Sequence, residues 1–313
     1  MRRILVAAAL FAVTAAPARA QSCAAGNTQD ACEKARDMWL YMMPQLGTSL
    51  VGGSHTLGIG GTLGGFPHFA IALRANAVMG NLPDLSGMTF AVGAAQNSNI
   101  DTPDQILGLP GVDFAVGVYK GFPLGVTRIG GVDLIGSVTY IPEIQGDGAS
   151  IIPQDGSTKI GLGARVGLLE QSLIVPGVSF SYLVRDLPVV SLTASSINAD
   201  IALNNFSVKT TSWRLAAQKN LLLFQLSAGY GQDTYDAAAE IAGTIAAQNF
   251  STLAAQNLKR TTMYGSLGIN LLLAKIIAEV GQVSGGEVTT FNTFAEPADK
   301  SRLYGSVGLR ISF

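Results

Sequence analysis

Nine charged side chains recur on one side of regularly alternating segments of this sequence. Successive side chains of an extended strand point to opposite faces, and these charges fall opposite the Leu, Ile, Val and Phe of their segments. They are Lys159, Arg165, Arg185, Arg214, Arg302, Arg310, Asp113, Asp133 and Glu279. Facing a common interior, they could select solutes by charge along a polarised passage. Alternatively, they could pair with one another in a filled interior that has no passage.

The two histidines offer little catalytic chemistry. His55 follows Ser54, and His68 also lies among glycines. A hydrolase needs a serine beside a base that a third group orients, and neighbours in a strand point to opposite faces, so Ser54 and His55 cannot pair. The glycine clusters at 58–61 and 161–163 lack the strand–turn–helix context of a phosphate-binding loop. We therefore expect no enzyme and no cofactor.

The two cysteines predict a disulfide rather than a metal site. Cys23 and Cys32 lie nine positions apart in a chain that carries an export signal. Thiols of exported chains are typically oxidised, so we expect a bridge that closes a short N-terminal loop. Two thiols with no nearby histidine do not complete a tetrahedral metal site.

The first twenty residues have the pattern of a secretory signal peptide. A basic start at Arg2 and Arg3 precedes the apolar stretch 4–16 and the small-residue cleavage pattern Ala18-Arg19-Ala20. The mature chain is then expected to begin at Gln21. Removing the three arginines of residues 1–20 takes the formal net charge from −1 to −4. No basic face remains, which argues against nucleic acid as a partner.

The chain is apolar without being concentrated into a membrane-spanning helix. Its mean hydropathy is +0.34, and only 13% of its residues are charged. No apolar run of the required length follows the signal, because Lys275 and Glu279 interrupt the closest candidate, residues 270–280. Hydrophobicity spread over alternating segments favours a sheet whose outer face contacts lipid.

Twelve segments read as strands of such a sheet. Nine are clear and the first three are weaker: 47–60, 66–78, 86–94, 113–118, 132–140, 159–168, 178–185, 211–217, 222–230, 263–271, 275–283 and 301–313. The connections between them alternate between long and short, as the outer loops and inner turns of a membrane barrel do. An even count places both ends on one side, and ten or fourteen strands are alternatives. A secreted β-sandwich would also alternate, but its apolar faces would point inward.

The N-terminal segment 21–46 is expected to contain a short helix. Residues 28–43 have helical composition, with Thr28 or Asp30 as the cap, and Pro44 is expected to end the helix soon after. It could plug the barrel or lie beneath it. The alanine-rich stretch 236–256 is expected to be an outer loop of helical composition.

The last strand carries a specific resemblance. Leu303–Phe313 alternates strictly between apolar and small or polar residues, and it stops on an aromatic side chain. It resembles the final strand of bacterial outer-membrane β-barrels, where that aromatic belongs to the recognition signal for insertion. The resemblance implies the outer membrane as location, Phe313 as insertion signal, and outer-membrane lipid and the barrel-assembly machinery as partners.

The expected fold is all-β: a closed antiparallel transmembrane β-barrel of about twelve strands over residues 47–313, preceded by a short helix. A porin or channel-like role, with passive passage or binding of a small-molecule solute, is the first functional hypothesis. The alternative is a structural or surface-interaction barrel with a filled lumen. Its function would be carried by the outer loops at 95–109, 142–157 and 232–257.

Overall fold

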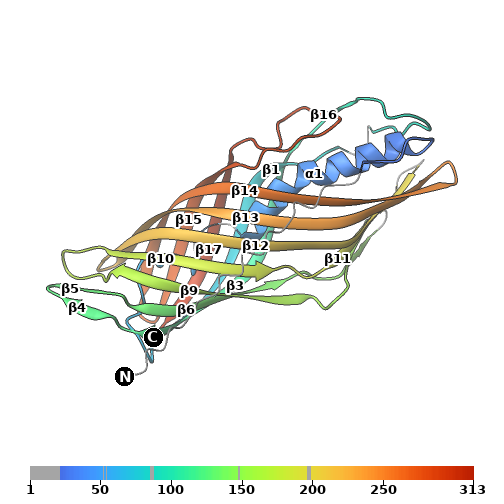
Figure 1. Cartoon of the computed structure of the whole chain (residues 1–313). Helices are drawn as coiled ribbons and strands as arrows, with labels where there is room; N and C mark the ends of the chain where they lie inside the picture. Colours follow the sequence, from blue (N-terminus) through green and yellow to red (C-terminus); the bar gives the residue numbers. More distant parts are fainter. Residues whose placement is uncertain (1–21, 52, 54, 85–87, 147–148, 196–198) are drawn as a thin grey trace, which may run out of the picture.

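The computed structural model describes residues 22–51, 53, 55–84, 88–146, 149–195 and 199–313. Within this part of the chain, ten antiparallel strands pair in chain order and close into a ring (Figure 1). They are β1 (Phe69–Asn81), β3 (Asp104–Tyr119), β6 (Val132–Tyr140), β9 (Thr158–Leu169), β10 (Gly177–Asp186), β12 (Ala199–Leu221), β13 (Phe224–Ile245), β14 (Gln248–Leu271), β15 (Ala274–Gly285) and β17 (Arg302–Ser312). The predicted signal peptide, residues 1–20, lies outside the described residues.

The ring closes between its first and last strands. β1 pairs with β17 from Ala70 opposite Ser312 onward. Beyond that pair, the Phe69 N–H donates to the Phe313 carbonyl oxygen at 2.9 Å, and the Phe313 N–H donates to Phe69 at 3.0 Å. Every ring strand thus has two neighbours, as a sheet surrounded by hydrocarbon requires. The predicted closed antiparallel barrel is confirmed.

The ring has ten strands, which is the smaller of the two alternatives to the expected twelve. In two of the three weaker segments, 47–60 and 86–94, none of the described residues belongs to a strand. Residues up to Val51 belong to the helix α1 (Gln29–Val51), and residues 88–94 are irregular. Their alternation failed as a guide because their backbone groups bond elsewhere; the Ala91 N–H, for example, donates to Asp30 at 2.8 Å. The third weak segment is β1, so the wall begins at Phe69 rather than at residue 47.

Three long strands carry the sheet well beyond the ring. β12, β13 and β14 contain 23, 22 and 24 residues, whereas crossing a bilayer takes about 9–11. Beside the far half of β12, the sheet continues sideways through three short strands: β11 (Val190–Ser195), β8 (Ala149–Pro153) and β7 (Ile144–Gly146). We call this part the outer extension: β7, β8 and β11 with residues 199–209, 234–245 and 248–259. Smaller pairs form between β2 (Asn99–Ile100) and β16 (Thr293–Phe294), and between β4 (Phe122–Leu124) and β5 (Thr127–Ile129).

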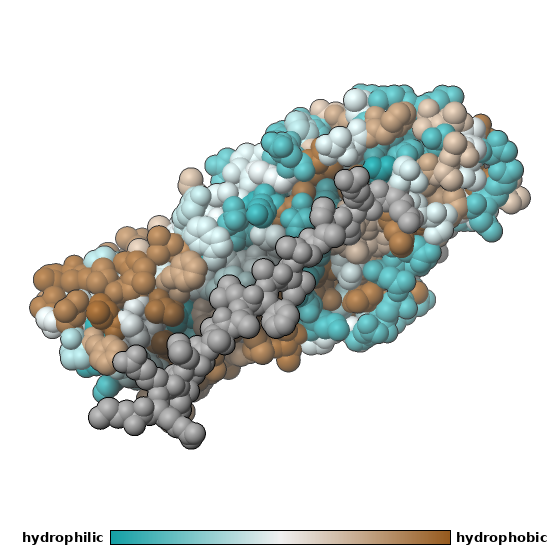
Figure 2. Space-filling view, viewed as in Figure 1, coloured by the Kyte–Doolittle hydropathy of each residue, from teal (hydrophilic) through white to brown (hydrophobic). Residues whose placement is uncertain are grey.

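The apolar face of the long strands is outside near the chain's C-terminus. Leu215, Leu226 and Leu267 point away from the ring and are 42%, 48% and 48% exposed. Figure 2 shows apolar residues gathered over this end of the molecule. An apolar exterior around a closed sheet is the arrangement of a barrel surrounded by lipid.

Farther along the same strands the apolar face is inside. Val208, Tyr235 and Leu258 point inward and are buried, while Lys209 and Asp236 are exposed on the outside. Each strand therefore passes from a region with an apolar exterior into one with a polar exterior. This is the pattern expected where a wall leaves lipid and enters water.

Helix α1 fills the outer extension. Met38, Trp39 and Met43 lie in one buried apolar cluster with Val208 and Tyr235 of the wall. The predicted end of the helix at Pro44 is wrong, because the helix continues to Val51.

A wall side chain replaces the hydrogen bond that Pro44 cannot make. Pro44 has no N–H to donate to the Leu40 carbonyl one turn earlier, and the Gln256 side-chain amide donates to it at 3.4 Å. Arg260 donates to the Pro44 carbonyl at 2.9 Å. The wall thus stabilises a helix that the proline would otherwise break.

The predicted outer loop 236–256 is also wrong. These residues form the ends of β13 and β14, joined by the turn at Ala246 and Ala247, which have positive φ values of 47° and 62°. Alternate alanines are small inward-facing wall residues; Ala237, Ala239 and Ala254 belong to the apolar cluster around α1. The other expected loops are also partly strand: 142–157 contains β7 and β8, and 95–109 contains β2 and the start of β3.

The predicted bridge between Cys23 and Cys32 is present, with 5.8 Å between the two Cα atoms. No helix among the described residues is long and apolar enough to cross a bilayer.

Candidate functional site

The interior of the ring is the candidate functional site, and eight of the nine predicted charged residues face it; the ninth, Lys159, lines the groove described below. Eight of them are buried: Asp113, Asp133, Arg165, Arg185, Arg214, Glu279, Arg302 and Arg310. Lys159 is half-buried.

Three buried arginines pair with aspartates of the neighbouring strand. Arg165 lies 3.0 Å from Asp133, directly opposite it across β9 and β6. Arg214 on β12 lies 2.7 Å from Asp233 on β13. Arg74 on β1 lies 2.6 Å from Asp113 on β3. Each pair neutralises a charge that would be costly to bury alone.

Sequence reasoning missed one member of two of these pairs. Arg74 belongs to the weak segment 66–78, whose alternation is too weak to predict an inward face. Asp233 falls within the expected outer loop 232–257. Continuing the alternation of β13 from Phe224 through Tyr230 would have placed Asp233 on the inward side with Gln225.

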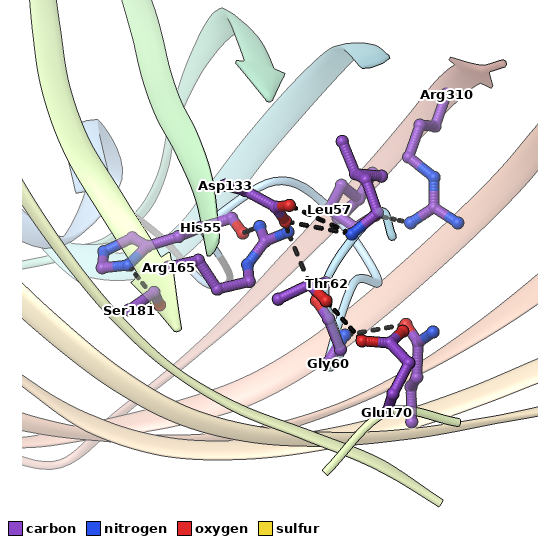
Figure 3. A network of polar contacts seen from close by, with 12 residues as sticks. His55, Leu57, Gly60, Thr62, Asp133, Arg165, Glu170, Ser181 and Arg310 are labelled. Carbon is purple, nitrogen blue, oxygen red and sulfur yellow. Dashed lines mark hydrogen bonds and ion pairs between the residues drawn. The ribbon is translucent and has the colours of Figure 1, made fainter. Parts of the chain in front are cut away.

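The chain between α1 and β1 runs through the ring. We call residues 55–65 the lumen segment. Figure 3 shows its residues reaching side chains of the wall. Asp133 accepts the Leu63 N–H at 3.1 Å, and Gln218 accepts the Gly60 N–H at 2.8 Å.

Wall cations and amides bind the carbonyl groups of the same segment. Arg165 donates to the His55 carbonyl at 2.6 Å. Arg310 donates to the Leu57 carbonyl and Gln225 to the Gly58 carbonyl. Just before the segment, Arg214 donates to the Gly53 carbonyl at 3.1 Å. The lumen charges are thus engaged by the protein's own backbone.

The His55 side chain is held between two strands of the wall. Its Nδ1 lies 2.8 Å from the Ser181 hydroxyl of β10, and its Nε2 lies 2.7 Å from the Ser212 hydroxyl of β12 (Figure 3 shows the first contact). All three side chains are buried. A histidine between two serines has the groups of a nucleophile and its base, but here they join the lumen segment to the wall. Ser54, the neighbour considered in the sequence, lies outside the described residues.

His68 lies just beyond the other end of the lumen segment. It is exposed, and its Nδ1 lies 2.8 Å from the Gly65 carbonyl oxygen in the same turn. The structure therefore does not bring the two histidines together. No group of three or more His, Cys, Asp or Glu side chains in the described ranges is arranged to hold a metal ion.

A groove of about 950 Å³ lies on the wall at the base of the outer extension. Its polar floor is one row of outward residues that face each other across four strands: Asp186, Lys209, Asp236 and Asn257. Alanine side chains lie beside the row, at Ala238 and Ala255. The groove thus offers alternating charges and an amide on a surface exposed to water.

No family model matches the chain, and no curated protein matches it in sequence. The solved structures to which it is similar include bacterial outer-membrane β-barrels. Ail, the attachment invasion locus protein of Yersinia pestis, is 9% identical, with 79% of this chain and 98% of that chain covered and a TM-score of 0.29. The toluene transporter TbuX of Ralstonia pickettii is 12% identical over 84% and 92%, with a TM-score of 0.29.

A third similar structure is a loop-deletion mutant of the outer-membrane protein OmpT of Vibrio cholerae. It is 13% identical over 78% of this chain and 98% of that chain, with a TM-score of 0.23. With TM-scores this low, the fold assignment rests on the strand pairing of the chain itself.

Proposed function

We propose that this protein is a surface-interaction barrel of the bacterial outer membrane, with its lumen closed by its own N-terminal part. The apolar exterior around the ring contacts outer-membrane lipid, and the export pattern and the C-terminal aromatic strand support insertion by the barrel-assembly machinery. The outer extension, with its groove and its polar exterior, is the part that meets other molecules.

The observation that carries this proposal is the way the lumen segment is bound. Arginine, aspartate and amide side chains from many ring strands bond its backbone, and His55 is held between two wall strands. Such contacts would have to break together before a solute could pass. The bonds of a buried segment to charged groups each contribute roughly 1.5–3 kcal/mol, so a spontaneously open state would be rare.

The experiment is single-channel recording of the purified full chain in planar bilayers, with a porin of known conductance as the positive control. We expect insertion, verified by flotation of the same preparation with liposomes, without conductance steps. Regular steps from the inserted full chain would overturn the proposal. They would instead support the channel-like hypothesis drawn from the sequence.

The proposal includes no catalysis. The His55 side chain with its two serines is buried, and the His68 ring lies against the Gly65 carbonyl of its own turn. Replacing His55 and His68 by alanine, singly and together, should leave the interaction of the outer extension with its partners unchanged once insertion is matched. Loss of that interaction in a fully inserted double variant would contradict this part of the proposal.

A further inference from the structure

A cavity of about 220 Å³ lies at the inner mouth of the barrel, the end at which the first and last ring strands meet. Its lining includes Gln225, Lys275, Arg310 and Ser312 of the wall and Thr62 of the lumen segment. It lies far along the strands from the outer extension, and the proposed surface interaction makes no use of it.

Two cations face this cavity from neighbouring strands. Lys275 and Arg310 are direct partners across β15 and β17, and the parity of both strands places them on the inward side. Arg310 is only 3% exposed. Like charges directly opposite one another repel and destabilise a sheet unless something compensates them.

No carboxylate compensates this pair within the described residues. The Gln225 Oε1 atom accepts from both cations, at 2.8 Å from Arg310 Nη2 and 3.0 Å from Lys275 Nζ. Arg310 otherwise donates to the Leu57 carbonyl, and its Nε is buried without a hydrogen-bond partner. Three of the other buried arginines, at 74, 165 and 214, each pair with an aspartate, whereas Arg260 and Arg302, like Arg310, bond neutral oxygens. Here two charges share neutral oxygens only.

The nearby acidic groups are engaged elsewhere. Glu170 accepts a hydrogen bond from Thr62 on the far side of the lumen segment (Figure 3). Phe313 also lines the cavity, and its backbone carbonyl oxygen accepts the Phe69 N–H at 2.9 Å. Neither Glu170 nor Phe313 forms an ion pair with Lys275 or Arg310 among the described residues, so the two cations stand beside hydroxyl and amide groups without a paired carboxylate.

We propose that this cavity binds a phosphate-type oxyanion between Lys275 and Arg310. A guanidinium beside an ammonium group supplies several charge-assisted donors, which suit an oxyanion with several acceptor oxygens. The volume exceeds the requirement of one ordered water many times, so a phosphate group fits. The same chemistry is offered by free phosphate and by the headgroup of a phospholipid at the rim.

The test measures binding to the full-length protein in phospholipid-free detergent micelles. Equilibrium dialysis with radiolabelled inorganic phosphate should give saturable binding of one phosphate for each chain. Lys275→Gln should weaken the affinity at least tenfold. Lys120→Gln is the matched control, because it removes the same charge at the same end of the barrel and Lys120 is exposed and outside the lining.

A second arm identifies the source of the anion. Phosphatidylglycerol is added to the micelles, and lipid retained after gel filtration is counted. If the site takes a lipid headgroup, one lipid should stay with the wild-type and Lys120→Gln proteins and be lost from Lys275→Gln. Folding of each variant is verified by heat-modifiable migration on gels. Arg310→Lys keeps the positive charge, so it should retain part of the affinity that Arg310→Gln loses.

Two results would overturn the site. One is that the folded wild-type protein binds neither phosphate nor phosphatidylglycerol saturably. This result is also expected if the chain's own terminal carboxylate fills the cavity. The other is equal affinity of Lys275→Gln and Lys120→Gln. Neither result bears on conductance, so this site and the closed lumen can fail independently.

Discussion

Asp133 and Arg165 face each other across adjacent strands with 3.0 Å between Oδ2 and Nη1, and their side chains are 0% and 1% exposed. The same two side chains hold the lumen segment at Leu63 and His55. We predict that Asp133→Asn lowers the free energy of unfolding by about 3–5 kcal/mol, because it leaves a buried guanidinium without a counter-charge. Denaturant titration in micelles, followed by heat-modifiable migration, measures this.

The matched control for that variant is Glu296→Gln. It breaks the pair of Lys300 with Glu296, whose side chains are 46% and 40% exposed, and exposed pairs contribute about 0–1 kcal/mol. Equal losses in the two variants would show that burial of the Asp133 pair does not matter.

His55 should be a stabilising residue. His55→Ala removes the partner of two buried hydroxyls, on Ser181 and Ser212. A buried group left without its hydrogen bond costs about 1–3 kcal/mol, so the unfolding midpoint should fall. His68→Ala, at an exposed position, should change stability by less than about 0.5 kcal/mol. A His55 variant as stable as the wild type would contradict the contacts that join the lumen segment to the wall.

The inner turns should lie in the lipid. Leu222 and Leu272 are 97% and 104% exposed, and they continue the apolar exterior of the ring. In a Trp39→Phe, Trp213→Phe background, tryptophan placed at either position should be quenched by lipids with brominated chains. Tryptophan at Asn249, an exposed residue of the outer extension, should not be. Absence of quenching at 222 and 272 would mean that the turns face water.

The disulfide should stabilise the start of α1 and not the ring. The Cys23–Cys32 bridge has a sequence separation of nine and spans the start of α1, and closing a loop of this length contributes about 2–3 kcal/mol. Cys23→Ser with Cys32→Ser should make the start of α1 sensitive to protease while the ring stays resistant. Loss of ring resistance would show that the two parts unfold together.

Acid should stabilise the contact between α1 and the connection that follows β15. Burial raises the pKa of Asp37, although the Asn292 N–H and side chain both donate to its carboxylate. Because the folded pKa lies above the unfolded one, the ionised group opposes folding, and this contribution disappears as pH falls through the raised value. Protease resistance of α1 should therefore rise toward acid pH in the wild type, relative to Asp37→Asn. Parallel pH profiles for the two proteins would contradict this.

Where the wall lies in an apolar environment, the sequence was a sufficient guide. In β9 and β10, Leu162 and Tyr182 alternate with Arg165 and Ser181 without interruption, because one face meets hydrocarbon and the other a polar interior. The inward face of every clear segment, and with it the position of each buried predicted charge, follows from that single contrast.

Where the surroundings change along a strand, the same reasoning failed. In β13, Tyr230 is followed by Asp233 and a run of alanines. These alanines are small because they pack against α1, but a run of alanines is also typical of a helix. The sequence therefore predicts helical composition where the structure has a strand. Residues 55–60 alternate like a strand, and the sequence therefore predicts one there. In the structure, however, their backbone groups form hydrogen bonds with side chains of the wall and not with another strand. Such partners lie more than 100 positions away and leave no local signal.

The path of residues 22–69 has a consequence for biogenesis. The polypeptide enters the cylinder at one opening and leaves it at the other, while the Phe69–Phe313 junction joins the two ends of the wall. Once α1 is folded and the Cys23–Cys32 bridge has formed, this part is too bulky to pass through the closed ring. We therefore expect the ring to close around a chain that is already in place, so that pairing of β1 with β17 is the committing step of assembly.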